Sequence, residues 1–283
     1  ACLPKDQRYV QSFAWQVHDN SIDSVGEPSY PDQMIRQWLG KDIRKMSIEE
    51  FTYWGGLVQS EGLREYCENF RRRMFDSASA IFWMYNDCWP ATRSWTIVDY
   101  YLRRTPAFAA VRRALQPLHV VVAEEGDEIV VFGVNERARG WKGTLRYGIF
   151  NLAGGLPLDR TLPVTLPPNA STRIASFRKS VWKKPLASAA VAMLCEGDAV
   201  VARNRLFLPL FKELKWARPR LKVRVSAGKA IFTSDTFVWG VCLDLNGRQP
   251  MPDNFFDVYP GIPHVIPWKS RSKPQVRFVG NLT

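Results

Sequence analysis

The chain has 283 residues, of which 46% are hydrophobic and 13% aromatic, and its formal net charge is +12. This length is enough for about two or three domains of roughly 100–150 residues each. No apolar run approaches the ~20 residues that a membrane-spanning helix needs, and the first residues lack the apolar stretch of a signal peptide, so we expect neither. The compartment is left open.

The basic excess raises the question of a polyanionic partner. The densest group of cations runs from Lys212 to Arg224. Its second half, residues 221–225, alternates apolar and basic side chains, which is typical of a half-buried strand with a cationic solvent face. We therefore expect no nucleic-acid partner and keep polyanion binding, with its steep salt dependence, as an alternative.

Cysteine and histidine give no sign of a bridged or metal-bound protein. The five cysteines and three histidines are widely spaced, at Cys2, Cys67, Cys88, Cys195, Cys242, His18, His119 and His264. This spacing matches neither a disulfide framework nor a zinc pattern. We expect no metal site and no cofactor.

Residues 1–46 look irregular apart from one short helix at 34–39. The clearest helix follows, because Ser47 and Glu50 fit a capping box and apolar residues then recur on one face as far as Phe70. Gly55, Gly56 and Gly62 argue against a single unbroken rod. The glutamates within it, Glu61, Glu65 and Glu68, are interpreted as solvated helix charges.

Residues 80–85 are apolar or aromatic at every position, which predicts a strand covered on both faces. Polar side chains begin at Asn86 and Asp87, and Trp89-Pro90 ends the run. In parallel α/β folds, ligands bind at the carboxyl ends of such strands. Trp83, Asn86, Asp87 and Trp89 are therefore placed where a site would form.

A second helix is expected after this loop, with Thr105 as its cap and Pro106 at its first position. Helix, strand, loop and helix make a β/α unit. A complete eight-fold barrel takes about 250 residues, so residues 1–117 could supply only its last one or two units.

From residue 118 onward the pattern changes to short β-type runs separated by turns. Runs spaced in this way predict an immunoglobulin-like sandwich followed by a smaller β unit. The runs are 118–123, 128–135, 144–150, 171–177, 189–195 and 199–206, then, after a connector at 211–219, residues 221–225, 229–234, 237–245, 255–258 and 276–280.

The loop after the predicted strand carries a resemblance to a known family. The block W-M-Y-N-D-C-W-P at 83–90 is followed by S-W at 94–95, D-Y-Y at 99–101, A-A-V-R-R-A at 109–114 and Pro117. This order resembles the final barrel strand and exit helix of glycoside hydrolase family 2, most closely its β-mannosidase branch. The tail, D-N-F-F-D at 253–257 with P-G at 260–261, is similar to the last domain of those enzymes.

The resemblance implies a multidomain fold: the C-terminal segment of a (β/α)8 TIM barrel (1–117), an immunoglobulin-like β-sandwich (118–214) and a smaller immunoglobulin-like domain (215–283). It implies a retaining exo-acting enzyme that removes terminal β-mannose with two glutamates, about 5–5.5 Å apart in such enzymes. Both glutamates are expected upstream of residue 1, so this chain supplies no catalytic residue and is expected to be inactive alone.

By the same resemblance, Trp83 would stack on the terminal sugar, and Asn86 and Asp87 would contact it or tie the strand end to its loop. Trp89 and Trp95 are taken as packing residues, and His18-Asp19 would lie near the pocket mouth. The expected partners are a carbohydrate and the missing N-terminal part of the enzyme. The oligomeric state is left open.

Two alternatives remain. The β domains could form a non-catalytic carbohydrate-binding or scaffold module, and the parent enzyme could be a related exo-β-glucosaminidase. An open barrel remnant would leave the apolar faces of Ile81, Phe82 and Trp83 uncovered. We therefore expect residues 1–117 to need the missing barrel, another chain or a rearrangement.

Overall fold

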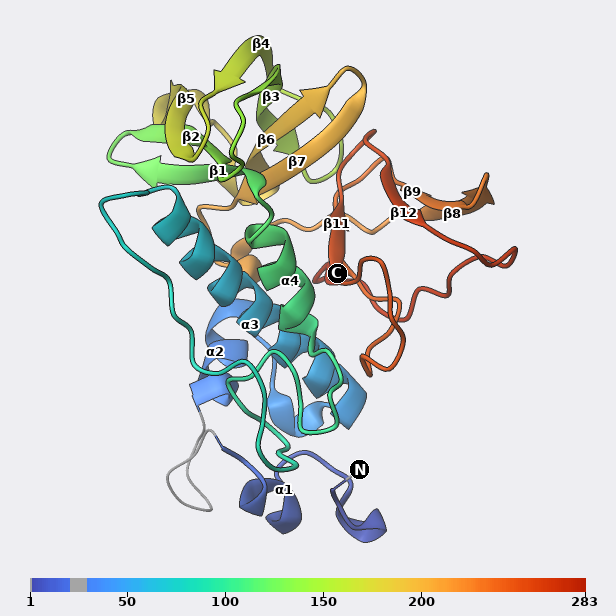
Figure 1. Ribbon diagram of the computed structural model, residues 1–283. Coiled ribbons are helices and arrows are strands. Elements are labelled where there is room, and N and C mark those ends of the chain that lie inside the picture. The colour runs from blue at the N-terminus through green and yellow to red at the C-terminus, as the bar shows by residue number, and fades with distance from the viewer. Residues whose placement is uncertain (1, 21–29) are drawn as a thin grey trace.

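The computed structural model describes residues 2–20 and 30–283. Helices form the first part of the chain and strands form the rest (Figure 1). The helices are α1 (Phe13–Val17), α2 (Tyr30–Leu39), α3 (Ile48–Arg71) and α4 (Pro106–Ala114), with short 3-10 turns at Lys5–Gln7, Ile43–Lys45, Lys179–Val181, Pro185–Ala187 and Phe211–Glu213. None of the helices in this described part is long and apolar enough to cross a membrane.

Helix α3 begins at the predicted capping box. Ser47 Oγ accepts from the Glu50 backbone N–H at 3.2 Å, and Glu50 Oε2 accepts from the Ser47 N–H at 2.9 Å. The helix then continues unbroken for 24 residues, so the glycines do not interrupt it. A Cβ on Gly56 would lie 2.3 Å from Pro106 Cγ, so this glycine is where α4 crosses α3 closely.

Seven strands form a sandwich of two antiparallel sheets. One sheet has the order β1-β2-β5 and the other β4-β3-β6-β7. Apolar side chains from both sheets, among them Val120, Val131, Leu145 and Leu194, share one buried core. The strands are β1 (Leu118–Glu125), β2 (Glu128–Asn135), β3 (Trp141–Asn151), β4 (Leu158–Leu166), β5 (Ala170–Arg178), β6 (Ser188–Glu196) and β7 (Ala199–Leu206).

The six strand runs predicted for this sandwich are confirmed, but β4 was missed. Its sequence is mostly polar and contains Pro163, which normally counts against a strand. Strand β4 pairs only with β3, so it lies at the edge of its sheet, where a residue without a backbone N–H is tolerated. The strand was therefore missed because it lies at the edge of its sheet, where proline is tolerated.

The smaller β unit has two sheets, β12-β9-β8 and β10-β11. Phe232, Val238, Phe256 and Ile266 share its core. Strand β12 was missed, and the strand predicted at 276–280 is wrong, because that segment makes only an isolated bridge from Phe278 to Cys242. The strands are β8 (Lys222–Ser226), β9 (Lys229–Thr233), β10 (Val238–Val241), β11 (Phe256–Val258) and β12 (His264–Pro267).

The strand predicted at residues 80–85 is also wrong for this structure. Residues 72–105, which connect α3 to α4, contain neither a helix nor a regular strand, only turns and isolated bridges. In Figure 1 this connection runs down beside the helices towards α1 and returns to α4. An apolar run becomes a strand only when neighbouring strands satisfy its backbone groups, and no strand lies beside it here.

Candidate functional site

The connection between α3 and α4 exposes an unusual amount of apolar surface. Ile81, Trp83 and Tyr85 are 81%, 72% and 59% exposed, whereas the intervening Phe82 and Met84 are half-buried. Phe82 packs against the small core beneath α3 and α4. Exposure that alternates every second residue is the side-chain pattern of a strand, although no strand pairs with this segment.

Asn86 and Asp87 follow directly and differ in their surroundings. The Asn86 side chain is exposed, and its Nδ2 donates to the Asp87 carbonyl at 3.3 Å. The Asp87 carboxylate is buried, and its Oδ2 accepts from Thr96 Oγ1 at 2.9 Å. Its Oδ1 has no hydrogen-bond partner among the described residues. Asp87 therefore fixes the loop from inside, while Trp83 and Asn86 face outward.

A buried ionic cluster holds the N-terminal segment against this loop. The Arg93 guanidinium bridges two carboxylates, with Asp19 Oδ2 2.6 Å from its Nε and Asp32 on another of its nitrogens. Trp15 and Phe51 place their rings 6.0 and 5.3 Å from the same guanidinium. A charge paired in this way stabilises a fixed loop geometry.

His18 and Trp89 lie side by side at the edge of this loop. Their rings stack with centroids 4.9 Å apart, and His18 Nδ1 is 2.7 Å from the Pro90 carbonyl. Trp89 Nε1 donates to Asn20 Oδ1 at 2.8 Å. Trp95, also expected to be a packing residue, is about half exposed. The structure thus brings His18 and Asp19 against residues 89–93, whereas Asn86 and Asp87 contact Val98 and Thr96.

The helix glutamates lie elsewhere, and for two of them the sequence interpretation is wrong. Glu61 and Glu68 are buried rather than solvated, whereas Glu65 is exposed. Glu61 Oε1 accepts from Arg205 at 2.5 Å and from Trp239 Nε1 at 2.9 Å, and its Oε2 accepts from Arg64 at 3.0 Å. Glu61 therefore joins α3 to both β units.

Burial alone would raise the pKa of Glu61, but the charges of Arg205 and Arg64 outweigh it and lower the pKa to about 2. Arg205 also pairs with Asp257 at 2.7 Å. A carboxylate held ionised by two guanidiniums is a poor proton donor, so this group has the chemistry of a structural junction. We call the set Glu61, Arg64, Glu68, Arg205 and Asp257 the junction network.

The junction network was not predicted from the sequence. Arg203-Asn204-Arg205 inside an otherwise apolar β7 pattern was the available signal, because polar residues facing a sheet interior need buried partners. Glu68 has such partners: its Oε1 accepts from Asn204 Nδ2 at 2.6 Å and lies 3.0 Å from His119 Nε2.

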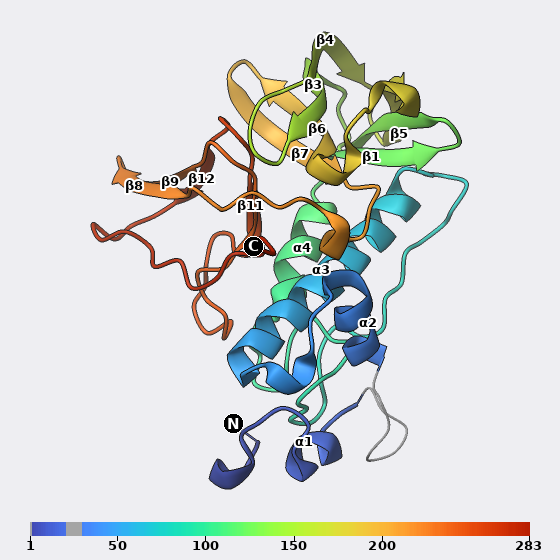
Figure 2. The ribbon, with the colours of Figure 1, turned by 180° about the vertical axis from the view of Figure 1, so that it is seen from behind.

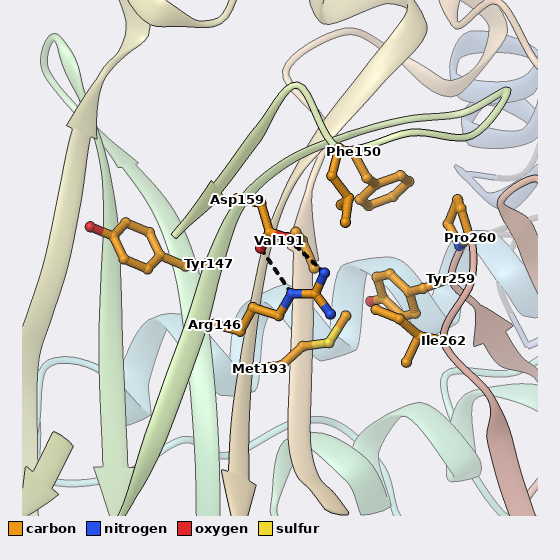
Figure 3. Close-up of a pocket in the computed structure, with 10 residues that line it drawn as sticks. Arg146, Tyr147, Phe150, Asp159, Val191, Met193, Tyr259, Pro260 and Ile262 are labelled. Atoms are coloured by element: carbon orange, nitrogen blue, oxygen red, sulfur yellow. Dashed lines mark hydrogen bonds and ion pairs between the residues drawn. The ribbon is translucent and has the colours of Figure 1, made fainter. Parts of the chain in front are cut away.

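Two hollows of very different size lie among the described residues. The pocket between the sandwich and the loop after β11, lined by Phe150, Met193 and Tyr259 beside the Arg146–Asp159 ion pair, has a volume of about 10 Å³ and admits at most one water (Figure 3). A cleft of about 430 Å³ runs between α3, β1 and residues 205–211, but its lining mixes both charge signs. In the described part of the chain, no group of three or more His, Cys, Asp or Glu is placed to hold a metal ion.

Comparison with known proteins shows what parts of this chain are similar to. A family model described as "Mannosidase Ig/CBM-like domain" matches residues 127–213. The chain is 39% identical over 122 residues to β-mannosidase B of Aspergillus flavus and to that of Aspergillus oryzae, covering 42% of this chain and 14% of each relative. It is similar to the C-terminal part of a glycoside hydrolase family 2 β-mannosidase. This resemblance, expected from the sequence, is confirmed.

Solved structures agree in fold. The crystal structure of β-D-mannosidase from Dictyoglomus thermophilum matches with a TM-score of 0.83 and 22% identity over 96% of this chain and 33% of that one. The exo-chitosanase of Amycolatopsis orientalis matches with a TM-score of 0.62 and 18% identity over 88% of this chain and 35% of that one. The chain therefore spans about a third of the length of these solved structures and about a seventh of the curated relatives that it matches.

Proposed function

We propose that this chain is the C-terminal portion of a retaining, exo-acting β-mannosidase-like glycoside hydrolase. In this proposal it supplies part of the wall of the sugar pocket and two accessory β domains. The observation that carries it is the outward-facing Trp83 at the start of a polar loop, in a chain 39% identical over 122 residues to β-mannosidases. The catalytic glutamates would lie outside this sequence.

The proposal treats residues 1–117 as the last part of a TIM barrel, with residues 80–85 becoming a strand once a neighbouring strand pairs with them. Two observations support this. The side chains already alternate in exposure from Ile81 to Tyr85, and the likeness to the Dictyoglomus enzyme covers 96% of the chain, helices included. Residues 118–214 and 215–283 would then be the two β domains.

Each site residue has a role suited to its surroundings. Trp83 presents an exposed aromatic face on which the C–H groups of a sugar can stack. Asn86 offers an exposed amide for a hydroxyl. Asp87 is buried, and its unpartnered Oδ1 either accepts from a sugar hydroxyl at the rim or orients the loop that does so.

The test is activity with and without an upstream barrel. The isolated chain is expected not to hydrolyse p-nitrophenyl β-mannoside. A chimera that joins the matching upstream region of Aspergillus oryzae β-mannosidase B to this chain should hydrolyse it, and Trp83→Ala should lower kcat/KM by roughly 10- to 100-fold through lost stacking. Hydrolysis by the isolated chain, or a folded chimera insensitive to Trp83→Ala, would contradict the proposal.

A second candidate is an exo-β-glucosaminidase, favoured by the fold similarity to the exo-chitosanase with a TM-score of 0.62. The β-mannosidase likeness is closer, at 0.83. The same chimera assayed with p-nitrophenyl β-glucosaminide separates the two. A non-catalytic module would instead bind mannose oligomers through residues 118–283, which calorimetric titration would detect.

A further inference from the structure

The basic excess of the chain is concentrated at its C-terminal end. Residues 215–283 contain eleven Lys and Arg against four Asp and Glu, a net charge of +7 out of +12. The sequence has no acidic residue from 215 to 234 or from 265 to 277. These two stretches contain or flank the sheet β12-β9-β8, so one small sheet concentrates much of the positive charge.

The cations of this sheet follow its strand pattern. Along β8 Lys222 and Arg224 are exposed, while the intervening valines pack against the core. The same alternation begins upstream, where Arg218 and Arg220 are exposed. Alternate residues of an extended chain lie about 7 Å apart on one side, so the basic side chains of β8 form a regularly spaced row.

The row continues around the hairpin turn. Lys229 pairs with Ser226 across β8 and β9, which places it on the same face as Arg224 and Lys222. The Trp268 N–H donates to the Gly228 carbonyl at 2.7 Å, and this contact brings the loop after β12 beside the turn. That loop exposes Lys269, Arg271 and Lys273. The sheet lies at one side of the molecule, beyond the sandwich and the helices (Figures 1 and 2).

These cations differ from those of the sandwich in their partners. Arg146, Arg173 and Lys179 of the sandwich region each pair with a carboxylate, at 2.7, 2.5 and 2.6 Å. In the part of the chain that the structure describes, no ion pair engages Lys222 or any later cation of the row. Their charge is therefore uncompensated and available to a ligand.

We propose that this cationic row binds an anionic polysaccharide, whose carboxylate or sulfate groups repeat along a linear chain. The β8 part of the row is regularly spaced, and the neighbours of its cations on the same face, Ile231 beside Arg224 and Val265 beside Ile231, are aliphatic and partly exposed. Proteins that bind single-stranded nucleic acid place aromatic side chains between their cations. The nearby Trp268 is half-buried and donates its indole N–H to the Ser272 carbonyl at 2.8 Å, so a polysaccharide is the better match.

The experiment measures binding of the full chain to size-defined polygalacturonate and heparin, with neutral mannan and single-stranded DNA as comparisons. The test variant is R220Q/K222Q/R224Q. The matched control, R178Q/K183Q/K184Q, removes the same charge from three exposed cations of the sandwich region. Circular dichroism establishes that both variants are folded. Binding requires no hydrolysis, so its failure is distinguishable from failure of the proposed glycosidase function.

We expect one or both acidic polysaccharides to bind, mannan not to bind, and the affinity to fall roughly tenfold between about 50 and 200 mM NaCl, because exposed charges are screened. The test variant should weaken binding roughly tenfold or more, and the control less than about threefold. Preference for polygalacturonate or for heparin assigns the anion as carboxylate or sulfate. Equal losses in both variants, no binding by either polysaccharide, or tighter binding of DNA would overturn the proposal. The proposal would also be overturned if the test variant aggregated while its remaining monomers bound the polysaccharide as tightly as the unaltered chain. The cations would then serve only to protect a sheet edge from aggregation.

Discussion

The junction network and the segment from Ile81 to Tyr85 differ in how far their side chains are paired or covered within the chain. In the junction network, charged groups from α3, β7 and β11 satisfy one another within the chain, as Glu61 does with Arg205 and Arg64, and Trp239 of β10 donates to the same carboxylate. Between Ile81 and Tyr85, large apolar side chains face outward and are left largely exposed by the described residues. The comparison indicates that the junction network stabilises the fold of this chain, whereas the exposed segment presents apolar surface that the described residues leave uncovered.

The largest expected effect comes from the junction network. Glu61→Ala should lower the free energy of unfolding by about 3–5 kcal/mol, because it leaves the buried Arg205 and Arg64 with one fewer counter-charge. Glu65→Ala, one turn on and exposed, is the control and should change it by less than about 0.5 kcal/mol. Urea unfolding followed by tryptophan fluorescence measures both. Similar values for the two variants would mean that the network is not structural.

Lowering the pH should reduce the contribution of the junction network to the stability of the fold. The folded-state pKa of Glu61 is about 2, below its usual value of 4.5. Its contribution to stability is therefore complete above about pH 5 and is lost as the pH falls from there towards 2. Glu61→Gln should show a smaller loss of stability over this window than the unaltered chain. If the free energy of unfolding fell equally with pH in both proteins, the lowered pKa assigned to Glu61 would be contradicted.

The next largest effect on stability is expected where α4 crosses α3. Gly56→Ala should destabilise the chain by about 2 kcal/mol, because the new Cβ would overlap the Pro106 ring. Gly62→Ala, in the same helix with open space around it, should instead stabilise by about 0.5–1 kcal/mol. Thermal unfolding should move in opposite directions for the two variants, and equal shifts would exclude close packing at Gly56.

The smallest effect is expected at the exposed segment. Trp83→Ala should change the free energy of unfolding by less than about 0.5 kcal/mol, because the side chain is 72% exposed. Trp15→Ala, at a buried site, should cost about 3–5 kcal/mol. A large loss at Trp83 would show that this chain covers the segment in solution, and would remove the contrast between the two regions.

Sequence patterns predicted the local structure where local chemistry determines it. The Ser47–Glu50 capping box and the apolar β-type runs of β1, β2 and β6 are short-range features, and each formed as expected. Residues 80–85 carry an equally clear apolar pattern, but a strand also needs a neighbour, and that information is not in the segment itself. Glu61 and Glu68 were misjudged for the same reason, since their partners Arg205 and Asn204 lie about 140 residues away in sequence.

The candidate site was predictable in composition but not in geometry. The block at 83–90 marked the loop that carries the candidate site, and its aromatic and amide groups are exposed at Trp83 and Asn86. The sequence alone could not show that Asp87 turns inward to Thr96, or that Arg93 joins Asp19 to Asp32. Both depend on how a long irregular connection folds back on the N-terminal segment.

The unbroken length of α3 has a mechanical consequence. Near its start, Tyr53 donates from its hydroxyl to the Gly240 carbonyl at 2.8 Å; further along it carries Glu61, and near its end Arg71 donates to the Gln116 carbonyl at 2.8 Å. A continuous helix that is held by contacts at three positions along its length resists bending between the parts it connects. If a ligand binds at Trp83, the parts that α3 connects would keep their spacing. The structure would then adapt to that ligand through the irregular loops rather than through hinge rotation of whole domains.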